Sequence, residues 1–93
     1  MTDEIEDTIE QRKVRESVTQ EVLRRDNFEC QVHMMQVWLA VEWRGRLDPH
    51  HVAPVSRFPE LRHDKANLLT VCRAHHDAIH GHPERARSLE LLA

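Results

Sequence analysis

The two cysteines of the chain are each followed, three positions later, by a histidine. The pairs are Cys30 with His33 and Cys72 with His75. Two intervening residues allow one turn to bring both members of a pair to a single metal ion, and zinc takes four sulfur or nitrogen ligands in a tetrahedron. The pattern therefore predicts a structural zinc on these four side chains. The alternative that it leaves open is a pair of buried free cysteines beside surface histidines.

A second group of residues could bind a metal or take part in catalysis: His50, His51, Asn67, His76 and His80. Side chains four positions apart on a helix point the same way, so His76 and His80 could hold one divalent metal between them. A third ligand could come from the His50-His51 dipeptide. A solvated helix face and a polar loop would explain each feature alone. Their joint occurrence with the Cys-x-x-His pairs makes coincidence a poorer explanation.

Composition and charge limit the classes of protein to which the chain can belong. It has 93 residues, a net charge of −3 and 40% hydrophobic residues, which suits one small domain with a limited core. No stretch of about 18 residues is free of charge, so no transmembrane span is expected. The acidic start has no apolar run and predicts no secretory signal. This favours the cytoplasm, where thiols stay reduced and cysteines near histidines indicate metal binding.

The elements that must position these groups are short. Residues 1–16 hold six acidic and three basic side chains and are expected to form a tail or the start of a solvated helix. A single domain is expected over residues 17–93. Ser17 and Gln20 form a capping-box pattern, which predicts a helix over residues 17–25.

The middle of the chain predicts a hairpin followed by a helix. β-forming side chains favour strands before the histidine pair, and apolar residues at helical spacing follow Asn67. Glycine and proline are expected to end that helix. The expected elements are a strand over residues 37–43, a turn at 44–46, a returning strand over 47–52, a loop over 53–65 and a helix over 66–80, ended by Gly81 and Pro83.

Basic side chains gather locally although the chain as a whole is slightly acidic. An acidic total weakens the case for a nucleic-acid-binding protein, but a local patch can still contact phosphates. Ordinary surface solvation is the alternative for each basic residue singly. The candidates for phosphate contacts are Arg57, Arg62, Lys65 and Arg73.

Taken together, the motifs resemble those of the HNH endonuclease family. The likeness extends from about Val22 to Gly81, and the ordered set of His-His, Asn and His-x-x-x-His is its most specific part. The residues that carry it are Val22-Leu23-Arg24-Arg25-Asp26-Asn27-Phe28-Glu29-Cys30, His50-His51-Val52-Ala53-Pro54-Val55-Ser56, Asn67-Leu68-Leu69 and Cys72-Arg73-Ala74-His75-His76.

The resemblance implies an α+β fold with a ββα-metal core, which is a two-stranded antiparallel hairpin plus a helix. An N-terminal helix and a structural zinc complete that fold. The resemblance also implies His51 as the general base and Asn67 as the residue that orients the base or its surroundings. The ligands that it implies for the catalytic metal are His50, His76 and His80.

Two features depart from the family pattern. The family normally holds its zinc with two Cys-x-x-Cys pairs, whereas His33 and His75 replace the second cysteine of each pair here. Both replacements can still bind zinc. The stretch over residues 34–48 is longer than in many relatives and ends in Asp48-Pro49, which affects the expected hairpin register but leaves the histidine pair intact.

The function implied by the resemblance is metal-dependent hydrolysis of DNA, by nicking or double-strand cleavage. The catalytic ion would be Mg²⁺, Mn²⁺, Ni²⁺ or Zn²⁺, beside a structural Zn²⁺. Small stand-alone members of the family commonly come from phages, so a packaging protein or another specificity-giving partner is an expected companion. Two alternatives remain open: a non-catalytic zinc-stabilised module that binds nucleic acid or protein, and an RNA-cleaving toxin with the same site.

Overall fold

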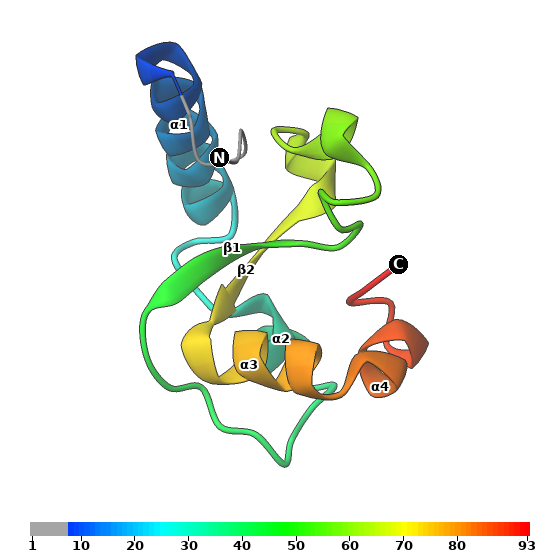
Figure 1. Ribbon diagram of the computed structural model, residues 1–93. Helices are drawn as coiled ribbons and strands as arrows, with labels where there is room; N and C mark the ends of the chain where they lie inside the picture. Colours follow the sequence, from blue (N-terminus) through cyan, green and yellow to red (C-terminus); the bar gives the residue numbers. More distant parts are fainter. Residues whose placement is uncertain (1–7) are drawn as a thin grey trace.

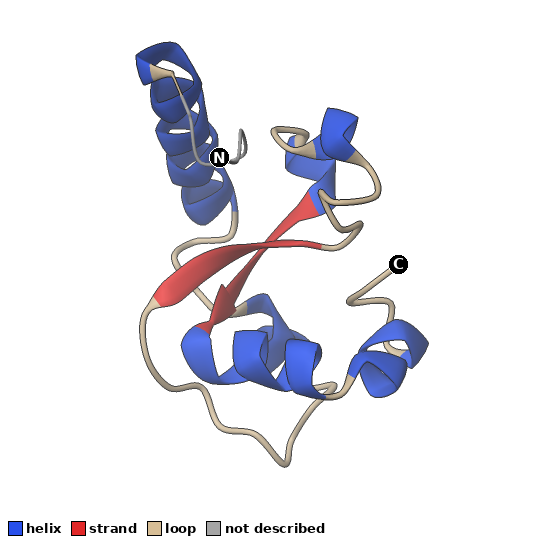
Figure 2. Ribbon diagram, viewed as in Figure 1, coloured by secondary structure: helices blue, strands red, loops and turns tan. Residues whose placement is uncertain are grey.

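The computed structural model describes residues 8–93 as an α+β fold, in which helices surround a two-stranded antiparallel hairpin (Figures 1 and 2). Within these residues, no helix has both the length and the apolar character that a membrane span requires. The elements are α1 (Ile9–Arg25), α2 (Gln31–Met35), β1 (Leu47–His51), the short 3₁₀ turns η2 (Pro59–Leu61) and η3 (Lys65–Asn67), β2 (Leu68–Cys72), α3 (Arg73–Gly81) and α4 (Pro83–Ser88).

The hairpin differs from the one that the sequence predicts. Strand β1 pairs with β2, so that Leu47 faces Cys72 and His51 faces Leu68. The prediction of a strand over residues 37–43 is wrong, because this segment has no strand beside it and instead turns around the buried Trp38. The helix predicted over residues 66–80 begins only at Arg73. Residues 68–72 are apolar on both faces, a pattern that periodicity alone cannot assign to strand or helix.

Proline is tolerated in β1 because of its place in the ladder. Pro49 stands opposite Thr70. The backbone N–H of Thr70 points away from β1 and donates to the Asp26 carboxylate at 3.0 Å. Pro49 and Thr70 therefore form a pair that exchanges no backbone hydrogen bonds across the hairpin. A strand accepts proline at such a position, because proline has no N–H to donate.

Helix α1 is longer than predicted and is anchored at its end. It begins with a capping box between Thr8 and Gln11, so residues 9–16 belong to the helix that was expected to start at residue 17. The part of the expected acidic tail before Thr8 lies outside the described residues. After Arg25 the buried Asp26 accepts two 2.8 Å bonds from the Arg25 guanidinium, and the same guanidinium donates to the Leu68 carbonyl. These contacts tie α1 to β2.

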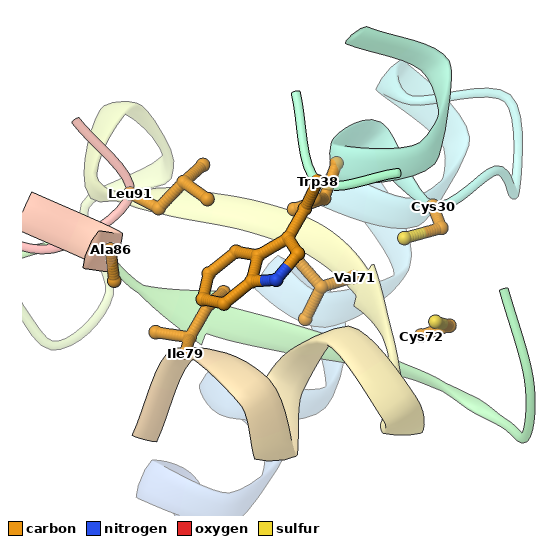
Figure 3. Close-up of a cluster of buried hydrophobic side chains, with 8 residues drawn as sticks. Cys30, Trp38, Val71, Cys72, Ile79, Ala86 and Leu91 are labelled. Atoms are coloured by element: carbon orange, nitrogen blue, oxygen red, sulfur yellow. The ribbon is translucent and has the colours of Figure 1, made fainter. Parts of the chain in front are cut away.

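The core is small and contains both cysteines (Figure 3). Trp38 lies at its centre, between Val71 of β2 and Ile79 of α3. Cys30 and Cys72 are fully buried at one edge of this cluster. A chain of this size buries too little apolar surface for a large margin of stability, so a metal bound at that edge would add substantially to it.

Candidate metal centres

The first candidate centre joins the loop before α2 to the β2–α3 junction. Cys30, Cys72 and His75 are all fully buried, and their ligand atoms lie within 4.8 Å of one another. The Nδ1 atom of His75 is 3.1 Å from Cys72 Sγ and 3.3 Å from Cys30 Sγ. Two sulfurs and one imidazole nitrogen form a donor set suited to zinc.

The orientation of the His75 ring supports metal binding. Its Nε2 atom lies 3.4 Å from the backbone carbonyl oxygen of Trp38. A carbonyl only accepts hydrogen bonds, so this contact places the ring proton on Nε2 and leaves the Nδ1 lone pair facing the sulfurs. Histidines that bind metals are commonly held in this way by a carbonyl on their second nitrogen.

Backbone N–H groups surround the Cys72 sulfur. The N–H groups of Arg44 and His75 each donate to Cys72 Sγ at 3.4 Å. Burial raises the pKa of the Cys30 thiol, although hydrogen bonds from the backbone of His33 and Cys72 act in the opposite direction. Metal binding at this site would therefore release a proton from Cys30.

His33 lies outside the cluster of three ligands. Its side chain is exposed on α2, and its ring centre is 5.4 Å from that of Trp43. The structure thus brings together three of the four residues predicted to hold a structural zinc. The Cys-x-x-His spacing explains the difference, because it brings the backbone of His33 to Cys30 without fixing where the imidazole points.

The second candidate centre consists of three histidines on β1 and α3. His50 is 1% exposed, and His76 and His80 stand one helical turn apart on α3. Their ring centres are 4.9–5.8 Å apart, and their ligand atoms fall within 4.8 Å of one another. The structure therefore gathers the predicted set of His50, His76 and His80. Three imidazoles suit Zn²⁺, Ni²⁺ and related transition-metal ions.

Neighbouring oxygens set the proton positions on two of these rings. His50 Nε2 lies 2.7 Å from the Leu91 carbonyl oxygen, and His76 Nδ1 lies 3.3 Å from the Asp48 carboxylate. These contacts place a proton on each bonded nitrogen and leave the opposite nitrogen of each ring for a metal. The carboxylate is available because the hydrogen bonds from Arg46 and His76 outweigh the effect of burial and keep the pKa of Asp48 low.

Burial keeps the imidazoles of His50 and His76 neutral. It is the main cause that lowers the pKa of His50 to about 4, and the nearby His76, His80 and His51 lower it further. The pKa of His76 is also lowered, chiefly by burial, although Asp48 acts in the opposite direction. Neutral imidazole is the form that binds metals, so both rings are in the required state near neutral pH.

His51 lies next to the second centre but faces away from it along the strand, because successive side chains of a strand alternate. Its Nε2 atom is 2.9 Å from the Arg62 carbonyl oxygen, which places the ring proton on Nε2 and leaves Nδ1 able to accept one. A hollow of about 240 Å³ is lined by His50, His51, His76 and His80 among others. The predicted base and the predicted metal ligands therefore border the same space.

Asn67 acts on the backbone rather than on an imidazole. Its Oδ1 accepts from the Ala53 N–H at 2.7 Å, and its Nδ2 donates to the Ala53 carbonyl at 3.1 Å and weakly to the Leu61 carbonyl at 3.5 Å. It does not bond the His51 ring. It closes the loop between β1 and β2, which carries the Arg62 carbonyl that holds His51. Asn67 is therefore a positioning residue.

Comparisons with protein-family models, curated proteins and solved structures find no match. The resemblance to HNH endonucleases therefore rests on the sequence motifs of this chain alone.

The four basic residues proposed for phosphate contacts have different surroundings. Arg73 bridges Asp77 at 2.7 Å and Asp48 at 3.2 Å, and Lys65 pairs with Glu21. Arg57 is exposed in the loop after β1, and Arg62 is partly buried beside His51. Arg62 contacts His51 through its backbone carbonyl, and Arg73 shares the Asp48 carboxylate with His76.

Sequence reasoning missed the groups that orient the histidines. Asp48 was visible as an acidic residue two positions before His50, a spacing that places both on one face of a strand. The carbonyls of Trp38, Arg62 and Leu91 carry no signal, because every residue has a carbonyl and only the fold decides which one meets a ring.

Proposed function

We propose that the protein is a metal-dependent endonuclease that hydrolyses phosphodiester bonds in DNA. The observation that carries the proposal is one hollow lined both by the three histidines that could hold a metal and by His51, whose Nδ1 is left able to accept a proton. A module that only binds a partner has no physical need for this combination. The cytoplasmic location and a specificity-giving partner, such as a phage packaging protein, belong to the same proposal.

The chain's own residues would divide the work of hydrolysis. His50, His76 and His80 would hold a divalent ion, which would supply charge stabilisation for the scissile phosphate and the leaving oxygen. His51 accepts the proton of the attacking water at Nδ1, because the Arg62 carbonyl occupies its Nε2–H. Asn67 holds the loop that supplies this carbonyl. Arg62, at the edge of the site, is the first candidate for a phosphate contact.

The centre at Cys30, Cys72 and His75 would bind zinc for structural reasons. It joins two segments that are far apart in the chain and lies at the edge of the core, away from the hollow lined by His51. His33 is the candidate for the fourth ligand, since it is close in sequence and its exposed side chain is free to reorient.

The deciding experiment measures relaxation of supercoiled plasmid by the purified protein. The reactions contain a chelator, Mg²⁺, Mn²⁺, Ni²⁺ or Zn²⁺. His51→Ala is the test variant, and His82→Ala, at an exposed histidine away from the hollow, is the matched control. We expect metal-dependent nicking that His51→Ala lowers at least about 100-fold and His82→Ala leaves unchanged, with equal metal content in all three proteins.

Absence of cleavage of plasmid by folded, metal-loaded protein would overturn the proposal. Cleavage of RNA alone would transfer the same site to a ribonuclease. Without cleavage of either substrate, the remaining interpretation is a zinc-stabilised binding module. The exposed apolar side chains of Met34, Met35 and Leu39 favour that second candidate.

A further inference from the structure

A second hollow of about 330 Å³ lies on the other side of His51, between α1 and the β1–β2 loop. Pro49 and His51 line both hollows, so the proposed base forms part of the wall that they share. Figure 1 shows α1 and the loop between β1 and β2, drawn green to yellow, both above the hairpin, on the side away from α3. A substrate strand whose phosphate lay at the three histidines would thus have a neighbouring space to enter across His51.

The lining of this second hollow combines apolar and polar groups. Val18, Pro49 and Leu68 supply apolar surface. Glu16, Thr19 and Gln20 contribute hydrogen-bonding groups from one face of α1, since residues three and four apart share a helix face. The cationic or titratable side chains are Arg15, Arg62, His51 and His63.

This composition matches a nucleotide better than a purely apolar ligand. A mostly apolar pocket with a few convergent polar groups, at the low end of the usual range of about 300–1,000 Å³, is typical of a small-molecule site. Enzymes that extrude a base hold it between apolar side chains and read its edge by hydrogen bonds. Arg62 and His51 would face the phosphate, and Glu16 could accept a bond from an exocyclic amine.

We propose that the hollow between α1 and the β1–β2 loop receives the unpaired nucleotide next to the scissile phosphate, so that the preferred substrate is single-stranded or locally unpaired DNA. This inference rests on the proposed nuclease function and deepens it. A base that is already unpaired enters such a pocket without first having to leave a duplex.

The test fills the hollow without touching the proposed catalytic groups. Val18→Trp places a large side chain in its lining, and Lys13→Trp adds the same side chain at an exposed position of α1 that does not line it. Three substrates are compared: a short single strand, the same strand paired with its complement, and bis(p-nitrophenyl) phosphate, a small diester with no base. A series of single strands then carries one abasic residue at successive positions.

We expect the wild type to cleave the single strand faster than the duplex. An abasic residue next to the cut should lower kcat/KM about tenfold, the scale on which loss of a small apolar contact acts. Val18→Trp should cause a similar loss on the intact strand and remove the effect of the abasic residue. Hydrolysis of the small diester should stay unchanged. Equal cleavage by the Val18→Trp and Lys13→Trp variants, or indifference to every abasic position, would overturn the inference.

Failure of the nuclease proposal gives a different pattern. In that case the wild type hydrolyses none of the three substrates with any metal. The role of the hollow is then tested by measuring how tightly the protein binds each form of DNA. Fluorescence anisotropy of the labelled strand should then show tighter binding of single strand than of duplex, weakened by Val18→Trp and unaffected by Lys13→Trp. Equal affinities of the two variants would overturn the inference in that case as well.

Discussion

His75 Nδ1 lies 3.1 Å from the sulfur of Cys72, three positions earlier in the chain, and the carbonyl of Trp38 holds the opposite side of its ring. We expect this arrangement to bind zinc and to stabilise the fold. Cys72→Ser should remove the zinc and lower Tm by at least roughly 10 °C, because a loss of 1 kcal/mol shifts Tm by about 4–8 °C in a domain of this size. Elemental analysis and calorimetry measure both quantities. An undiminished zinc content in Cys72→Ser, relative to the wild type, would contradict the assignment.

His33 tests whether the site needs a fourth protein ligand. Because its side chain lies against Trp43 and outside the cluster, His33→Ala should keep one zinc per chain at this site. Its zinc affinity should fall by less than that of Cys72→Ser in a competition titration with a chelator. Equal losses in the two variants would show that His33 leaves Trp43 and completes the tetrahedron.

The low pKa of His50 predicts a stability that depends on pH. The pKa of His50 is about 4 in the folded protein, against the ordinary value of 6.5 that applies to the unfolded chain. As the pH falls, the unfolded chain therefore takes up the proton first. The stabilising contribution is fully present above about pH 6.5 and is lost as the pH falls towards 4. Its upper bound is about 3 kcal/mol.

Chemical denaturation of the metal-free protein between pH 7 and pH 4 measures this dependence. His50→Asn removes the titrating group, so the variant should show a shallower loss of unfolding free energy over the same interval. Parallel pH profiles for wild type and variant would refute the assignment. Asp26 does not interfere, because its folded pKa lies below the ordinary value of 3.8 and its effect falls at lower pH.

Asn67 should influence catalysis without holding a metal. Asn67→Ala removes its bonds to the Ala53 backbone and frees the loop that carries the Arg62 carbonyl. We expect kcat for plasmid nicking to fall roughly 10- to 100-fold, since small misplacements of a catalytic group have effects of this size. KM and the content of both metals should stay near wild type. Loss of metal in parallel with activity would instead indicate a general structural role.

The anchor between α1 and β2 should make a large contribution to stability. Asp26 accepts from the Thr70 N–H and from Arg25 while 9% exposed, so Asp26→Ala leaves a buried donor unpaired. We expect a loss of about 2–4 kcal/mol in the free energy of unfolding. Arg24→Ala, at an exposed position two residues earlier in the last turn of α1, is the control and should change the free energy of unfolding by less than about 0.5 kcal/mol.

The sequence carried enough information to group most of the candidate metal ligands but not to assign every helix and strand. The i, i+4 spacing grouped His76 with His80, and the family resemblance added His50 from the His50-His51 dipeptide. The three ligands of the first centre followed equally from their spacing. The ligand role of His33 did not, because spacing places a backbone and leaves χ angles open.

Errors in the strands have a different origin. Residues 37–43 have β-forming side chains, but a strand requires a partner, and β1 pairs with residues 68–72 instead. That choice depends on contacts between distant segments, such as the bond from Thr70 to Asp26. Local propensity contains no information about such contacts. The carbonyls of Arg62 and Leu91 were invisible for the same reason.

The alternation of His50 and His51 along β1 has a consequence for how the gene can change. A single inserted or deleted codon between Leu47 and His51 would move every following side chain to the opposite face of the hairpin. His50 and His51 would exchange faces, so both hollows would lose the histidine side chains that line them now. Length variation should therefore be confined to the irregular segments on either side, residues 37–46 and 53–64, while the spacing within β1 stays invariant.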